Sequence, residues 1–201
     1  FLIGADGARS LVRQTLGFGW QGETGIKREF MGGRMFSVYL RAPDFHDHLK
    51  HPLAWMYVSF NPQRRGFMMS VDGKGEFAFH AALREDEQTD DWGETEARQL
   101  LRDAMGLSLP VRILSTGTWL AGHALYAEHF QRGRVFIAGD AAHLFTPTGG
   151  LGYNTAIEDA INLGWKLAAV LQGQAPQGLL DSYERERLPA ARRNTGYARQ
   201  F

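Results

Sequence analysis

The sequence predicts a mixed fold, part α/β and part α+β, on three observations. Residues 1–17 are typical of a strand, a turn and a short helix that is closed by Gly17. Residues 34–121 contain segments that alternate apolar and polar residues or are rich in aromatic and β-branched ones, as antiparallel strands are. Residues 134–201 return to a short apolar strand, a glycine-rich loop and two helices.

The middle of the chain is predicted to form an antiparallel sheet. Its strands are expected at residues 34–41, 54–60, 66–71, 76–82 and 112–121. Asp72-Gly73-Lys74-Gly75 is a strong hairpin signal. One helix interrupts the set, from Glu94 to Met105, and Gly106 is expected to end it. The apolar stripe of that helix consists of Ala97, Leu100, Leu101 and Ala104.

Two more helices are predicted in the last third of the chain. The first runs from about Thr155 to Leu171, and Thr155-x-x-Glu158 matches a capping box at its start. Its buried face is expected to consist of Ile157, Ala160, Ile161, Gly164, Leu167, Ala168 and Leu171. The second begins at about Leu179. Its charged residues are expected to form a solvated, salt-bridged face, and they are Glu184, Arg185, Glu186, Arg187, Arg192 and Arg193.

The composition excludes several classes of protein. A hydrophobic content of 44% supports a packed core and argues against disorder. Basic and acidic residues are equal in number, 22 of each, which argues against bulk affinity for nucleic acid. Because there is no cysteine, disulfides, thiolate nucleophiles and cysteine-ligated zinc are excluded, which fits a cytoplasmic protein. No apolar run approaches the roughly 18–20 residues that span a bilayer.

Two motifs invite a functional interpretation that their surroundings do not support. Gly17, Gly19 and Gly22 form a literal G-x-G-x-x-G, but a predicted helix precedes it and no helical stripe follows, as a dinucleotide site requires. The histidines of residues 46–51 lie between two prolines with no second ligand cluster, so a solvated loop is expected there rather than a metal site.

The most specific signal is a short strand that ends at Gly139-Asp140 and is followed by Gly149-Gly150-Leu151-Gly152 before a helix. An aspartate just past the carboxyl end of a strand can accept hydrogen bonds from ligand hydroxyls. A glycine run before a helix lets a planar or anionic ligand approach free backbone N–H groups at the positive end of the helix.

These residues carry a resemblance to a known family. The segment GRVFIAGDAAHLFTPTGGLGYNTAIEDAINLGWKLAAVL is similar to the GD motif and following helix of the class A FAD-dependent aromatic monooxygenases. GADGARSLVR is similar to the DG motif of the same family. The resemblance implies a partial FAD/NAD(P)-binding domain of the GR2 type with an antiparallel substrate-domain sheet. It implies residues 1–33 and 123–201 as parts of the FAD-binding domain and 34–122 as the substrate-binding domain.

The resemblance also implies a set of cofactor contacts. Asp140 is expected to bind the ribityl chain of FAD, with Gly139 allowing close approach, and Pro147 is expected beside the isoalloxazine ring. Asp6 and Gly7 are expected near the pyrophosphate and the NAD(P)H route, with Arg13 as the basic end of that motif. For Asp6 and Arg13, a helix-capping carboxylate and a surface charge are the alternatives. Contacts to the pyrimidine edge are expected from Gly150, Leu151, Gly152, Tyr153 and Asn154.

The activity implied is an NAD(P)H-consuming hydroxylation of an aromatic ring, phenolic or polyketide-like, by O₂ through a flavin C4a-hydroperoxide. The flavin carries the chemistry, so no catalytic side chain is assigned. Sheet residues including Trp55, Phe67, Phe77, Phe79 and His80 are candidates for an aromatic pocket, although such residues are more often core. A homodimer is compatible with the sequence, and no metal is expected.

Two alternatives remain open. One is another flavin oxidoreductase of the same superfamily, and the other is a non-catalytic remnant that binds a flavin or an aromatic ligand. The family's FAD domain begins with a strand and a true G-x-G-x-x-G, which the first residues of this sequence do not contain. We therefore expect a truncated segment whose independent binding of FAD is in doubt.

Overall fold

A computed structural model describes residues 1–26, 33–49, 51–106 and 108–200. The contacts divide the chain into two compact units. The first consists of Phe1–Ile26 with Gly122–Phe201, and the second of Lys27–Ala121. No helix within the described ranges is long and apolar enough to cross a membrane.

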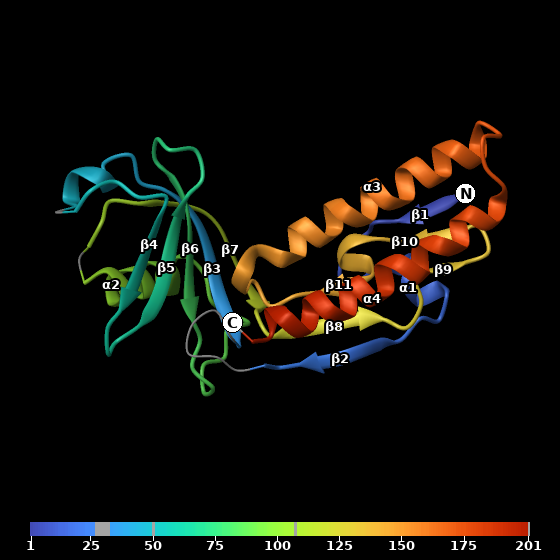
Figure 1. Cartoon of the computed structure of the whole chain (residues 1–201). Coiled ribbons are helices and arrows are strands. Elements are labelled where there is room, and N and C mark those ends of the chain that lie inside the picture. Colours follow the sequence, from blue (N-terminus) through green and yellow to red (C-terminus); the bar gives the residue numbers. More distant parts are fainter. Residues whose placement is uncertain (27–32, 50, 107, 201) are drawn as a thin grey trace. The chain divides into compact units, whose positions relative to one another are not determined.

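The first unit combines two small sheets with helices (Figure 1). Strand β1 (Leu2–Gly4) lies parallel to β10 (Val135–Ile137), which pairs antiparallel with β9 (Gln131–Arg132). The second sheet has the order β11-β8-β2. Its strands are β2 (Trp20–Thr24), β8 (His123–Ala127) and β11 (His143–Leu144). The helices are α1 (Leu11–Thr15), α3 (Leu151–Leu171) and α4 (Asp181–Ala198), with short 3₁₀ turns η2 (Gly139–Ala141), η3 (Thr148–Gly150) and η4 (Gln177–Leu180).

Aromatic residues hold the core of the first unit together. Phe130, Phe136 and Tyr183 are each 0% exposed, and the Tyr183 ring contacts both phenylalanine rings. The Tyr183 hydroxyl donates to the carbonyl of Ile137, at 2.8 Å, and burial strongly raises the pKa of this tyrosine. Helix α4 is thereby fixed to the end of β10, directly before the Gly139-Asp140 turn.

The start of helix α3 differs from the expectation. The helix begins at Leu151 rather than at about Thr155, because Gly149 and Gly150 adopt left-handed conformations, with φ of 79° and 64°, that turn the chain into the helix. Thr155 does not cap the helix. Its hydroxyl lies one turn inside and donates to the carbonyl of Leu151 at 2.8 Å. The predicted capping box is therefore wrong, while the predicted end at Leu171 is confirmed.

The predicted buried face of α3 is also largely wrong. Ile157, Ile161 and Leu171 are 38%, 65% and 69% exposed. Apart from Leu167, the buried side chains lie on another face, which carries two charged residues, and they are Thr155, Asp159, Leu163 and Lys166. The reason is that α3 packs against α4 through paired charges, which a pattern of apolar residues does not reveal.

The charged residues of α4 are not all solvated either. Arg187 is 8% exposed and is paired with Asp159 and Glu158 of α3. Glu186 pairs with the buried Lys166, and Glu184 accepts hydrogen bonds from backbone N–H groups of residues 130 and 131. The expectation of a purely solvated face is corrected, because these groups join α4 to α3 and to β9.

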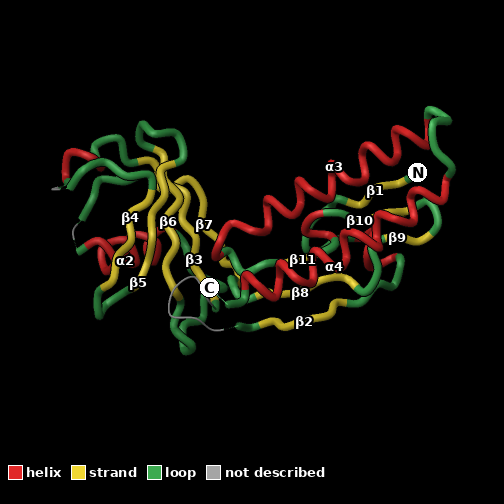
Figure 2. Tube along the Cα trace, viewed as in Figure 1, coloured by secondary structure: helices red, strands yellow, loops and turns green. Residues whose placement is uncertain are grey.

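The second unit is a five-stranded antiparallel sheet with helix α2 (Glu94–Met105) against one face (Figures 1 and 2). The strand order is β4-β5-β6-β3-β7. The strands are β3 (Arg34–Arg41), β4 (Met56–Phe60), β5 (Arg65–Ser70), β6 (Glu76–Ala82) and β7 (Arg112–Leu120). The predicted antiparallel strands are confirmed with small shifts at their ends, and Gly106 ends α2 in a left-handed conformation as expected.

The literal G-x-G-x-x-G has the surroundings that were expected: Gly17 and Gly19 follow helix α1, and Gly22 lies within strand β2, so a strand and not a helix continues the motif. The histidine segment is only partly the solvated loop that was expected. Residues 45–48 form a 3₁₀ turn, η1 (Phe45–His48), in which His48 is exposed but Phe45 is buried and His46 packs against it. Over the described parts of the chain, no group of three or more histidine, cysteine or acidic residues is placed to hold a metal ion.

Candidate functional site

The two predicted ligand-binding motifs meet at one edge of the β1-β10-β9 sheet. β1 and β10 are parallel neighbours, with Gly4 opposite Ile137, so the segments after them leave the sheet on the same side. Asp6 and Gly7 follow β1, and Gly139 and Asp140 follow β10. The carboxyl edge of a parallel strand pair is where α/β sheets bind their ligands.

The Gly139-Asp140 turn is tight and leaves its carboxylate free. Gly139 has a φ of +60°, which a side chain would strain, and its carbonyl accepts from the N–H of Ala142 at 2.7 Å. The Asp140 side chain is exposed, next to a half-buried Gly139. Within the described residues, no donor is hydrogen-bonded to its carboxylate. A carboxylate held in this way is able to accept hydrogen bonds from a ligand.

The N-terminus of α3 offers backbone donors. Gly150 is its N-cap, in a left-handed conformation, and no side chain caps the first turn. A Cβ at Gly150 would meet nothing within 4 Å, whereas one at Gly152 would lie 3.4 Å from the ring of Phe145. The Asn154 amide donates to the Gly150 carbonyl at 2.7 Å and so braces the loop. Pro147 lies just before this turn and precedes η3.

Asp6 performs the helix-capping role that was one of its two interpretations. Its Oδ2 accepts from the N–H groups of Leu11 and Val12, at 2.7 and 3.2 Å. The Ser10 hydroxyl, followed by these N–H groups, lowers the pKa of Asp6. Gly7, with a φ of +80°, forms the turn between Asp6 and the helix.

Arg13 is not the surface charge that was its alternative interpretation. It is 7% exposed, and its guanidinium donates to the carbonyl of Phe18 at 2.9 Å and lies 4.1 Å from the centre of the Trp20 ring. Burial lowers its pKa. These contacts join α1 to β2, so Arg13 stabilises the interior of the first unit.

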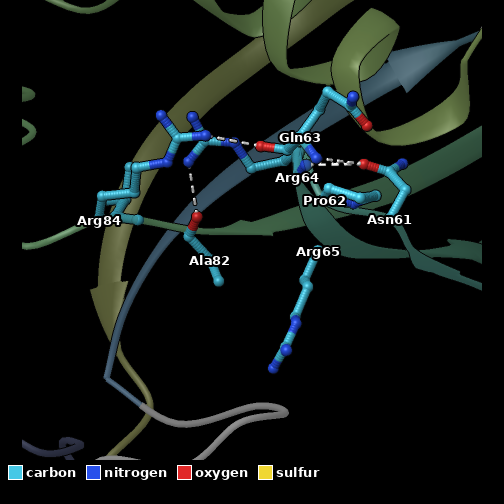
Figure 3. Close-up of a pocket in the computed structure, with 8 residues that line it drawn as sticks. Asn61, Pro62, Gln63, Arg64, Arg65, Ala82 and Arg84 are labelled. Atoms are coloured by element: carbon cyan, nitrogen blue, oxygen red, sulfur yellow. Dashed lines mark hydrogen bonds between the residues drawn. The ribbon is translucent and has the colours of Figure 1, made fainter.

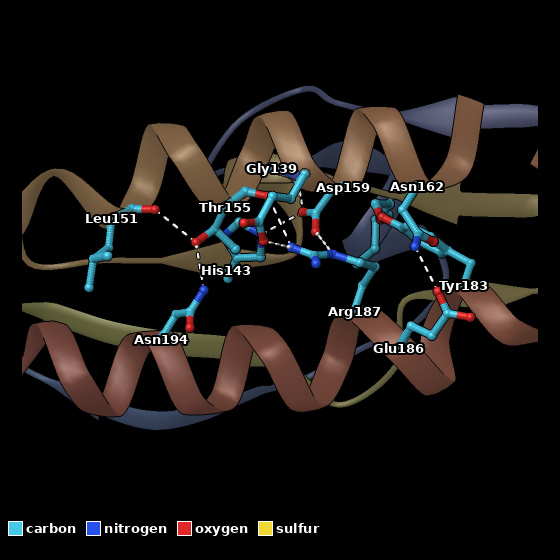
Figure 4. A network of polar contacts seen from close by, with 12 residues as sticks. Gly139, His143, Leu151, Thr155, Asp159, Asn162, Tyr183, Glu186, Arg187 and Asn194 are labelled. Carbon is cyan, nitrogen blue, oxygen red and sulfur yellow. Dashed lines mark hydrogen bonds and ion pairs between the residues drawn. The ribbon is translucent and has the colours of Figure 1, made fainter. Parts of the chain in front are cut away.

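A buried charged network lies directly behind the Gly139-Asp140 turn (Figure 4). Asp159 of α3 is 0% exposed, and its Oδ2 accepts from the Gly139 N–H at 3.1 Å and from His143 Nε2 at 2.6 Å. Its Oδ1 accepts from Arg187 Nε at 2.8 Å. Burial alone would lower the pKa of Arg187, but its hydrogen bonds to Asp159 and Glu158 outweigh this effect and raise it.

Sequence reasoning did not select Asp159, His143 or Arg187. Asp159 and Arg187 are 28 residues apart; Arg187 stands in a run of charged residues, and Asp159 follows Glu158 in a helix whose apolar residues suggest a different buried face. The sequence does place His143 and Asp159 on either side of the glycine-rich loop. Only the fold shows that this loop brings the two side chains back into hydrogen-bonding contact.

The sheet of the second unit carries aromatic residues on both faces. Phe77 and Phe79 are 0% exposed and belong to the core against α2. His80 alternates to the opposite face, where it stacks on Phe67 at 4.8 Å between ring centres. Trp119 Nε1 donates to His80 Nδ1 at 3.1 Å, and burial lowers the pKa of His80. Because Nδ1 accepts, Nε2 is the ring nitrogen that carries the hydrogen.

A surface pocket of about 340 Å³ lies beside the β4–β5 turn of the second unit (Figure 3). Two of its arginines are already committed to protein partners. Arg64 pairs with Glu87 at 2.6 Å, and Arg84 donates to the carbonyl of Gln63 at 2.8 Å. None of the predicted cofactor-binding residues lines this pocket.

The fold is that of a flavin-binding domain. A family model described as an FAD binding domain matches residues 1–198, and the chain belongs to that family. It is 38% identical over 200 residues to a tetracenomycin A2 monooxygenase-dioxygenase of Streptomyces glaucescens, covering 94% of this chain and 34% of that protein. It is 36% identical over 204 residues to a 2,4-dichlorophenol 6-monooxygenase of Delftia acidovorans, covering 96% and 33%.

The chain is also similar to solved structures. A complex of aklavinone-11 hydroxylase with FAD and aklavinone matches with a TM-score of 0.86 and 34% identity, over 98% of this chain and 36% of that one. The resemblance to the flavin-dependent aromatic hydroxylases and the predicted fold class are thereby confirmed. The chain spans about a third of the length of the curated relatives it matches.

Proposed function

We propose that this protein is an FAD-dependent monooxygenase that consumes NAD(P)H and O₂ and hydroxylates an aromatic substrate. The observation that carries the proposal is the carboxyl edge of the β1–β10 pair. The Asp140 carboxylate follows this edge and has no protein partner among the described residues. The same compact unit contains the N-terminus of α3 at Gly150, which no side chain caps. The relatives and structural neighbours of the chain are monooxygenases and hydroxylases, and the aklavinone-11 hydroxylase was solved with FAD.

The residues present fit the flavin half of FAD. A ribityl chain offers hydroxyl donors, and Asp140 offers an acceptor with no protein partner among the described residues. The pyrimidine edge of an isoalloxazine ring offers carbonyl acceptors, which the backbone N–H groups of Leu151, Gly152 and Tyr153 in the first turn of α3 are able to meet, and Asn154 braces that turn through its side-chain amide. The left-handed Gly149 and Gly150 keep side chains out of the approach to this helix end.

Each part of the site has a defined task in this proposal. When bound, FAD supplies the redox chemistry, taking electrons from NAD(P)H and activating O₂ for transfer to the ring. Asp140 holds the ribityl hydroxyls, and the positive end of α3 favours negative charge on the ring system, an effect of about 0.3–1 kcal/mol. Pro147 limits the space beside the ring. Asp6, Gly7 and Arg13 contribute through the shape of the loop after β1.

The aromatic substrate is assigned to the second unit. We propose residues 34–122 as the substrate-binding domain and residues 1–33 and 123–201 as parts of the FAD-binding domain. The face of the sheet opposite α2 supports this, because the half-buried His80 and Trp119 rings lie on it beside the buried Phe67. Partly exposed aromatic rings on a sheet face are able to pack against a planar ligand. The names of the relatives make a phenol or a polyketide the preferred substrate class, and we assign the enzyme to the cytoplasm, with a homodimer as a compatible assembly.

The test is made on the natural full-length protein. Titration with FAD should quench flavin fluorescence and shift the visible flavin bands, and 2,4-dichlorophenol or a polycyclic phenol should accelerate NAD(P)H oxidation and give a hydroxylated product. Asp140→Ala should weaken FAD binding. FAD binding without any substrate-stimulated oxidation would favour the non-catalytic alternative, and no binding of FAD at all would refute the proposal.

A further inference from the structure

A charged side chain of another element fixes the Gly139-Asp140 turn at the Gly139 amide. Among the contacts of the described residues, this is the bond to Asp159 of α3. The Gly139 N–H points to Asp159 Oδ2, at 3.1 Å. Asp140 is the next residue, so the direction of the Gly139 peptide sets the direction in which the Asp140 carboxylate leaves the turn. A hydrogen bond from a backbone N–H to an ionised carboxylate is stronger than one between two neutral groups.

Asp159 is itself held on both of its oxygens. Arg187 Nε donates to Oδ1 at 2.8 Å, while the Gly139 N–H and His143 Nε2 donate to Oδ2. The side chain is 0% exposed, so its charge is stable there only with these partners. Arg187 is oriented in turn by Glu158, at 2.8 Å, and by the carbonyl of Thr155, at 3.3 Å. A continuous chain of polar contacts thus runs from α4 through α3 to the turn (Figure 4).

We infer that Asp159 is a positioning residue for Asp140. The Asp159 carboxylate, balanced by Arg187 and His143, fixes the Gly139 peptide so that Asp140 presents a carboxylate with no protein partner among the described residues to the ligand. This inference rests on the proposed function for the ligand, FAD, but the fixing of the turn is a property of the chain by itself. It assigns a role to three residues that form no part of the flavin contacts set out above.

The substitution Asp159→Asn separates this role from simple packing. An asparagine has the same shape but only one acceptor oxygen. The cationic Arg187 takes that oxygen, because a charged donor outcompetes a neutral one. The N–H₂ group of the substituted side chain then faces the Gly139 N–H, and the turn loses its acceptor.

The chain contains a matched control on the same two helices. Lys166 of α3 is 0% exposed, and its Nζ donates to Glu186 Oε2 of α4 at 2.7 Å and to Asn162 Oδ1 at 2.8 Å. This second bridge joins α3 to α4 as the first one does, but among the described contacts it makes no hydrogen bond to the Gly139-Asp140 turn. Lys166→Ala therefore weakens the helix pair without releasing the turn.

The experiment measures amide hydrogen exchange at Gly139 by NMR in the natural full-length protein without FAD. In the wild type the Gly139 amide should exchange slowly. Asp159→Asn should accelerate its exchange about tenfold or more, corresponding to the loss of a charged hydrogen bond, while Lys166→Ala should leave Gly139 unchanged relative to the amides of β10. Equal exchange at Gly139 in Asp159→Asn and wild type would overturn the inference.

Two further measurements keep the test decisive. If Asp159→Asn does not fold, the wild type still decides, because an unprotected Gly139 amide in the folded protein contradicts the inference and a protected one supports it. With FAD added, Asp159→Asn should raise the Kd about tenfold and change the visible circular dichroism of the flavin, and Lys166→Ala should do neither. If wild type does not bind FAD but Gly139 responds as expected, the proposed function fails and the turn-fixing role of Asp159 stands.

Discussion

Replacing Arg187 with leucine should be among the most damaging single changes in the first unit. Arg187 donates to two carboxylates that differ in exposure: Asp159 has a side chain that is 0% exposed and Glu158 one that is 56% exposed. Removing one partner of a buried pair leaves the other charge unpaired in the interior, which costs about 3–5 kcal/mol. The exposed pair is worth about 0–1 kcal/mol. Nearly all of the loss should therefore come through Asp159.

The assay must report the first unit alone, since a chain of two compact units is not guaranteed to unfold in one step. Amide exchange of the α3 interior meets this condition. Arg187→Leu should accelerate exchange there by at least about a hundredfold, the factor that corresponds to about 3 kcal/mol. Glu158→Gln is the control and should change it by less than about fivefold. If the two variants behave alike, the assignment of the buried pair as the major contribution is wrong.

Three further changes have defined outcomes. The Asp72 carboxylate accepts hydrogen bonds from backbone N–H groups of the hairpin, that of Glu76 first, and these bonds lower the pKa of Asp72 to about 2. The stabilisation by the ionised carboxylate should therefore be complete above a pH of about 4 and lost as the pH falls to about 2. Asp72→Asn should remove this pH dependence from acid unfolding curves, and identical curves for the variant and the wild type would contradict the argument. Tyr183→Phe leaves the buried Ile137 carbonyl without its 2.8 Å donor and should cost about 1–3 kcal/mol in urea denaturation, with a loss below about 0.3 kcal/mol as the contrary result. Gly150→Ala should destabilise by about 1–2 kcal/mol because φ is +64° there, whereas Gly164→Ala, inside α3 with nothing near its Cβ, should stabilise by roughly 0.5–1 kcal/mol; the same sign for both would refute the argument.

The parts of the fold that could be predicted are those in which the local backbone conformation is set by residues close together in the sequence. The Asp72-Gly73 hairpin is an example, since the Asp72 side chain satisfies three N–H groups of its own turn. The end of α2 at Gly106 is another, because the backbone turns left-handed there and glycine adopts that conformation without steric strain. The alternation of β6 likewise identifies its two faces from the sequence.

Helix α3 shows where this kind of reasoning ends. Its apolar residues suggested a buried face through Ile157 and Ile161, but those side chains are exposed in this structure. The face that is buried includes Asp159 and Lys166, whose partners Arg187 and Glu186 lie on another helix 28 and 20 residues away. Apolar periodicity measures only the side chains that avoid water and contains no information on charges that are buried as pairs.

The same distinction explains the composition of the candidate site. Residues expected to touch a flavin were visible because the ligand requires them in exposed loops: glycines that leave the backbone open, and an aspartate after a strand. Asp159 and its partners act on the turn from inside the protein, where they resemble ordinary helix residues. A ligand site built on backbone N–H groups and one free carboxylate depends on the geometry of its turns. On the proposed function, the buried charges behind those turns are therefore as much a part of the candidate site as the groups expected to face the ligand.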